Sequence, residues 1–134
     1  MTSQLNVDTI KGKSTAGSIT IQGEGSATTN LQQGITKCWL HYAAPSTSNG
    51  QTITAEDSFS LSSLVDNGDG QVMINMTNSM ANATYVLLPC GQSNIISCMD
   101  TDTMTTAQVR METYNHTGYV LNSLGMAAIQ GDLA

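Results

Sequence analysis

The chain has 134 residues, enough for one domain, and only 10% of them are charged, with a formal net charge of −6 at pH 7. Four Lys and Arg stand against ten Asp and Glu, which argues against binding to a phosphate backbone. No apolar run approaches the roughly 20 residues of a membrane-spanning helix, so we expect no membrane insertion. The polarity comes from Ser, Thr, Asn, Gln and Gly, which suit strands and turns better than exposed helices. The composition therefore indicates a β-rich protein.

Residues 1–34 differ from the rest of the chain, because their apolar residues are few and alternate in short runs between glycines. Strands this short bury too little apolar surface to fold alone. They could form a disordered tail, or a stem in which several copies wrap around a shared axis. Regular alternation favours the stem, since it is uncommon in disordered segments. The residues expected to pack along the stem axis are Leu5, Val7, Ile10, Ile19 and Ile21.

Residues 35–134 show stronger alternation and are expected to form an all-β, antiparallel, sandwich-like head. The candidate strands are spaced near the 8 to 12 residues typical of sandwiches and barrels, and helical periodicity is absent. The run 83–90 is continuously apolar, which predicts a strand buried on both faces. The run 58–65 alternates, and its phase slips at Leu64, which indicates a bulge or the end of a strand. The residues expected to fill the head core or its subunit contacts are Trp39, Phe59, Val72, Ile74, Tyr85, Val86 and Leu87.

The sequence "DNGDG" at residues 66–70 raises the question of a metal loop. A calcium loop needs oxygen ligands at alternate positions, but counting from Asp66 these positions are Gly68 and Gly70. Asn-Gly and Asp-Gly steps instead tolerate positive φ and lie between two alternating runs. We therefore predict an exposed hairpin turn formed by Asp66, Asn67, Gly68, Asp69 and Gly70.

The remaining candidates for chemistry are isolated in the sequence. Asp100 and Asp102 could hold a divalent ion, but no Glu or His lies near them in the sequence. The N-terminus "MTSQLNVDTIKGK" lacks the apolar region of a secretory signal peptide, and the number of cysteines is odd, so Cys38, Cys90 and Cys98 are expected to be buried free thiols in a reducing cytoplasm. We expect no catalytic residues, no metal and no cofactor.

The run "DSFSLSSLVDNGDG" and the following "VMINMTNSMANATYVL" resemble a recurring module of phage tail fibres, especially those of marine and cyanobacterial phages. The upstream segment "LQQGITKCW" and the closing strand "GMAAIQG" are similar to the entry and the last strand of that module. Met76 departs from the family, which has an aromatic residue there. The resemblance implies a trimeric virion appendage with a β-sandwich-like head and an intertwined N-terminal stem.

Three functions follow for comparison. The first is a short trimeric tail fibre or spike that is assembled in the host cytoplasm, docks on other virion proteins through its stem and contacts a host surface glycan or protein. The second is a capsid decoration or head-fibre protein built on the same module. The third is a small polysaccharide depolymerase, which needs two carboxylates facing each other across about 5 to 9 Å. Its candidate acids are Glu56, Asp57, Asp66, Asp69, Asp100 and Asp102.

Overall fold

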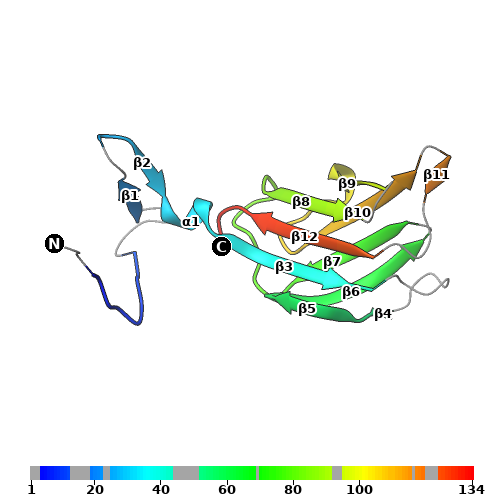
Figure 1. Ribbon diagram of the computed structural model, residues 1–134, viewed down its shortest axis with the longest axis horizontal. Helices are drawn as coiled ribbons and strands as arrows, with labels where there is room; N and C mark the ends of the chain where they lie inside the picture. Colours follow the sequence, from blue (N-terminus) through cyan, green and yellow to red (C-terminus); the bar gives the residue numbers. More distant parts are fainter. Residues whose placement is uncertain are drawn as a thin grey trace.

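The chain forms an all-β structure of two main antiparallel sheets, with a small two-stranded hairpin near the N-terminus (Figure 1). The computed structural model describes residues 4–12, 19–22, 25–43, 52–68, 70–91, 95–115, 117–119 and 124–134. Its helical structure within these ranges is one turn, α1 (Leu31–Gly34), and a short 3₁₀ turn, η1 (Thr101–Thr103). The expected all-β class is confirmed.

The smaller main sheet has four strands, and both of its central strands connect to chain segments near the termini. In spatial order the strands are β5 (Ala55–Phe59), β3 (Thr36–Tyr42), β12 (Gly125–Gln130) and β8 (Val86–Gly91). The run 83–90 was expected to be buried on both faces, and this is wrong. β8 is an edge strand whose Val86 and Leu88 are exposed, and the edge position accommodates Pro89, which has no N–H to donate.

The larger sheet follows the order β9, β10, β7, β6, β4, with the short β11 beside the end of β10. Alternate residues of both main sheets point inward and form one apolar core, so the two sheets pack as a sandwich. The strands of this sheet are β4 (Thr52–Ile53), β6 (Leu61–Gly68), β7 (Gln71–Met76), β9 (Ile96–Asp100), β10 (Gln108–Asn115) and β11 (Gly118–Tyr119). The largest fully buried side chains are those of Tyr42, Leu40, Leu64, Ile74, Met80, Met111, Ile129, Val109 and Cys38.

The chain passes from one sheet to the other at Ser60, so residues 58–65 do not form a single strand. Ser60 adopts a positive φ of 57°, and its carbonyl accepts a hydrogen bond from the Thr77 N–H at 2.9 Å. β5 ends before this corner and β6 begins after it. A register shift between Leu61 and Ser63 accounts for the slip in phase that the sequence shows.

The N-terminal hairpin lies beyond one end of the sandwich and leads through α1 directly into β3 (Figure 1). Its strands are β1 (Thr20–Gln22) and β2 (Thr28–Asn30), and the Leu31 N–H donates to the Ile19 carbonyl at 2.9 Å. Four of the five residues expected at the stem axis, Leu5, Val7, Ile10 and Ile21, are exposed, and Ile19 is partly buried. The sharing of these side chains between copies stays a prediction.

Candidate functional site

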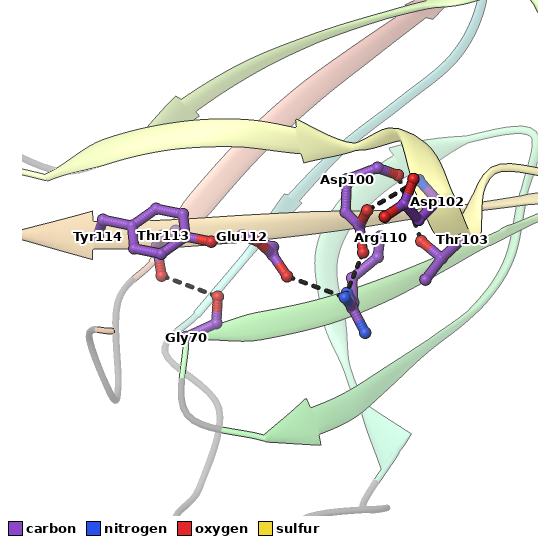
Figure 2. A network of polar contacts seen from close by, with 8 residues as sticks. All are labelled: Gly70, Asp100, Asp102, Thr103, Arg110, Glu112, Thr113 and Tyr114. Carbon is purple, nitrogen blue, oxygen red and sulfur yellow. Dashed lines mark hydrogen bonds and ion pairs between the residues drawn. The ribbon is translucent and has the colours of Figure 1, made fainter. Parts of the chain in front are cut away.

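The turn between β6 and β7 is hydrogen-bonded to the neighbouring strand β10. The Gly70 carbonyl accepts hydrogen bonds from the N–H and Oγ1 of Thr113, at 2.8 and 3.1 Å (Figure 2). Gly68 and Gly70 have φ of 136° and 69°, as expected for a turn that needs positive φ. The expectation of a wholly exposed turn is wrong, because Gly70 is buried by this contact. Asn67 is exposed, and Asp69 lies outside the described residues.

Asp66 is the second correction to the exposed turn. It is only 4% exposed, since it continues the inward alternation of Leu64, and its Oδ1 accepts a hydrogen bond from the Gly68 N–H at 3.1 Å. Burial raises the pKa of the Tyr42 hydroxyl, and the nearby Asp66 carboxylate raises it further. Asp66 is therefore an internal residue at the end of the core, unsuited to hold an ion in an open loop.

A polar network covers part of the outer side of the larger sheet, where β9 and β10 run together. Arg110 Nη2 bonds Asp100 Oδ2 on the strand opposite and lies 3.1 Å from Glu112 Oε1 (Figure 2). The hydroxyl of Tyr114 donates to the other oxygen of the Glu112 carboxylate. The two carboxylates are largely buried, at 12% and 10% side-chain exposure, and the single positive charge of the guanidinium lies within ion-pair distance of both.

This network has the appearance of an acid pair, but all four of its carboxylate oxygens already have partners, although the buried Nε of Arg110 has none. Asp100 Oδ1 accepts from the Asp102 N–H at 2.9 Å and caps η1, while Oδ2 takes Arg110. The guanidinium thus contacts both carboxylates. Among the residues described, no group of three or more His, Cys, Asp and Glu could hold a metal ion. The network links β9 to β10 through the ion pair between Asp100 and Arg110.

Two of the cysteines, Cys98 beside this network and Cys38 in the other main sheet, are also poorly suited to chemistry. Burial raises the pKa of Cys98, and the carboxylates of Glu112 and Asp100 raise it further, against a hydrogen bond from Tyr114 that lowers it. Burial raises the pKa of Cys38 to about 11. Both groups are therefore thiols at neutral pH, which makes them weak nucleophiles and weak metal ligands. All three cysteines are free, but the expectation that they are buried holds only for Cys38, because Cys90 is exposed and Cys98 is partly buried.

The outer face of the four-stranded sheet, the side turned away from the core, carries an exposed apolar row. In the strand register Phe59 lies opposite Trp39, Trp39 opposite Ala128, and Ala128 opposite Leu88. These four residues, one from each strand, are called the outer apolar row below. Val86 and Met126 lie on the same face beside it. This row is the candidate functional surface of the head.

The residues expected in the core or in subunit contacts divide between these two places. Val72, Ile74, Tyr85 and Leu87 are buried in the core, whereas Trp39, Phe59 and Val86 are exposed on the outer face. Reasoning from the sequence missed Leu88 and Met126 as members of this surface. The continuous apolar run from Tyr85 to Leu88 hides which residues point outward, so only the pairing of β8 with β12 reveals the row.

Charged and polar groups stand at the ends of the outer face. His41 Nδ1 lies 2.8 Å from Glu56 Oε2, and His41 is opposite Asp57 in the register. On the other side of Trp39, Lys37 is largely buried, and this burial lowers its pKa, while the Asp132 carboxylate raises it. The apolar row therefore runs between two charged margins.

The chain matches no protein-family model, no curated protein and no solved structure. No helix within the described ranges is long and apolar enough to cross a membrane. The features that bear on function are the fold, the exposed apolar residues of the N-terminal segment, the outer apolar row and the resemblance of the sequence motifs.

Proposed function

We propose that this chain is a structural protein of a phage virion, a short trimeric tail fibre or spike whose head contacts the host surface. The observation that carries the proposal is the N-terminal segment. It lies outside the sandwich, yet its apolar side chains alternate as in a buried strand and are exposed in the single chain.

Within the described part of the chain, the apolar side chains of the N-terminal segment lack a surface against which they could pack. A two-stranded hairpin such as β1–β2 is marginally stable in water without further packing. Burying one large aliphatic side chain contributes about 1.5–3 kcal/mol, and Leu5, Val7, Ile10 and Ile21 have no such burial within their own chain. Three copies around one axis would bury each of these residues against its equivalents and so stabilise the stem.

The sandwich supports a role in construction rather than catalysis. Its polar network ties β9 to β10, and its hairpin turn is bonded to β10 through Gly70 and Thr113. In this proposal the chain needs no cofactor. The stem docks on other virion proteins, and the head presents loops to a glycan or protein of the host.

The stem is tested by the mass of the purified full-length protein in light scattering. The wild type should have three times the chain mass of 14.1 kDa. The double variant Ile19→Asp/Ile21→Asp should be monomeric, because it would bury charges at the shared axis. The matched control is Ile96→Asp, a change at an exposed apolar residue of β9, which should leave the trimer intact. A monomeric wild type would contradict the proposed trimer.

A further inference from the structure

We propose that the outer apolar row is a second contact between copies of this chain, in which the heads of one trimer meet through their four-stranded sheets. This inference rests on the proposed trimer and extends it from the stem to the head. The face is covered by the equivalent faces of the other two copies, which the three-fold axis of the stem relates to it.

The row is continuous across the whole sheet. Directly opposite residues of neighbouring antiparallel strands lie about 5 Å apart, so Phe59, Trp39, Ala128 and Leu88 form one uninterrupted line. Both edge strands and both central strands contribute one residue each. Such a line is a property of the folded sheet, because the four residues are far apart in the sequence.

The exposed area matches what one side of a stable interface needs. The exposed fractions are 38% for Trp39, 55% for Phe59, 51% for Val86, 51% for Leu88 and 43% for Met126. With large side chains of about 150–250 Å² each, these five expose about 450 Å² of apolar surface. A standard interface buries about 800 Å² on each partner, of which about 56% is apolar. Over its contacts with both neighbouring copies, the face thus supplies about the apolar area of one side of a standard interface.

The chemistry of the face favours a protein surface as its occupant. Two of its large residues, Trp39 and Phe59, are aromatic. The other three, Val86, Leu88 and Met126, are aliphatic or carry a thioether. Aromatic residues and Met are enriched in protein interfaces. The charged groups, Lys37 and the His41–Glu56 pair, stand at the margins. The exposed carboxylate of Asp57 lies on the same face, opposite His41 and at the same end as the His41–Glu56 pair, so the charges of the face are gathered at its margins.

The path of the chain favours another copy over an unrelated protein. The hairpin of the stem continues through α1 into β3, which is a central strand of this sheet and carries Trp39 (Figure 1). When three stems share an axis, their three β3 strands start from that axis. The sheet that begins at the axis is then the part of each head placed nearest to its equivalents.

The test uses Trp39, which is the only tryptophan of the chain. In full-length wild-type protein, quenching of its fluorescence by acrylamide should be slow, because the contact between heads covers it. Leu88→Asp places a charge opposite Ala128 and should open the contact. Quenching should then rise roughly fourfold, from an interface core below a tenth exposed to the 38% of the single chain. Phe59→Ser, on the opposite edge strand, should have the same effect.

Ile96→Asp is the matched control for an added charge, and its quenching should equal that of the wild type. Light scattering on the same samples separates the two proposals. A trimeric wild type whose Trp39 is quenched as fast as in Leu88→Asp overturns the head contact and leaves the stem trimer standing. A monomeric wild type overturns both. A trimer that keeps slow quenching in Leu88→Asp and Phe59→Ser shows another cover for Trp39 and also overturns the head contact.

Discussion

Cys38 illustrates how a single buried group ties the stability of the sandwich to pH. It lies in the core of the four-stranded sheet, 1% exposed, between Lys37 and Trp39 of the outer face. Burial disfavours the thiolate and raises the pKa from its ordinary 9.0 to about 11. Because the folded state holds the proton more tightly than the unfolded state, this contribution to stability is complete below pH 9 and is lost as the pH rises toward 11.

We therefore expect the free energy of unfolding to fall between pH 9 and pH 11, with about 2–3 kcal/mol of the loss due to Cys38. Tyr85, whose pKa burial raises to about 12, adds a loss that begins near pH 10. Urea titrations at a series of pH values measure the effect. Cys38→Ala is the control, since it keeps the tyrosine contribution and removes that of the thiol. Identical pH dependence in the variant and the wild type would refute the assignment to Cys38.

At the scale of elements, the side chain of Arg110 links β9 to β10 in addition to the backbone pairing of the two strands. Arg110 contacts Asp100 across the strand pair and Glu112 on its own strand. Both carboxylates are about nine-tenths buried, so their charges have little access to water once the guanidinium is removed. The network thus ties the edge strand β9 to the rest of the larger sheet.

Arg110→Met should lower the free energy of unfolding by about 3 kcal/mol, because it leaves two buried like charges without their partner. Thermal and urea unfolding at neutral pH measure the change. Lys11→Met is the control, since it removes a cation from an exposed position and should alter stability by less than about 0.5 kcal/mol. Equal stability of Arg110→Met and the wild type would show that the network does not support the sheet.

The elements also show what could be predicted from the sequence. In the sequence of β3, Cys38 and Leu40 alternate with Trp39, which is typical of a strand with two different faces, and in the structure Cys38 and Leu40 are buried whereas Trp39 is exposed. Ser60 defeats the same reasoning, because a serine at positive φ carries no sequence signal of a corner between two sheets. The continuous apolar run in β8 predicted burial on both faces, which is wrong. The sequence alone cannot distinguish an exposed apolar face from a buried one, because the difference depends on how the strands pair.

The Arg110 network was only half visible in the sequence. Arg110 and Glu112 are two residues apart in the sequence of β10, which is typical of side chains on one face of a strand, but Asp100 joins them only through the pairing of β9 with β10. Asp66 was misplaced for a related reason, because its polar character predicted an exposed turn while its phase after Leu64 turned it inward. Contacts between residues distant in sequence decide both positions.

On the scale of the whole molecule, the sandwich has one apolar core between its two sheets. Two further groups of apolar side chains are exposed in the single chain. One is the stem segment with Leu5, Val7, Ile10 and Ile21, and the other is the outer apolar row of the head. A protein that builds a virion appendage from identical copies accounts for both surfaces, because each is covered by its equivalents around one axis.

The most direct test of this account is an electron-microscopy map of the intact phage particle of which we propose that the chain is a part. The account predicts that the map shows three copies of the sandwich around one axis on a tail appendage, with the stem toward the particle and the four-stranded sheets facing inward. Absence of the chain from purified particles would contradict the proposed function, and copies that follow the capsid lattice would contradict its place on the tail.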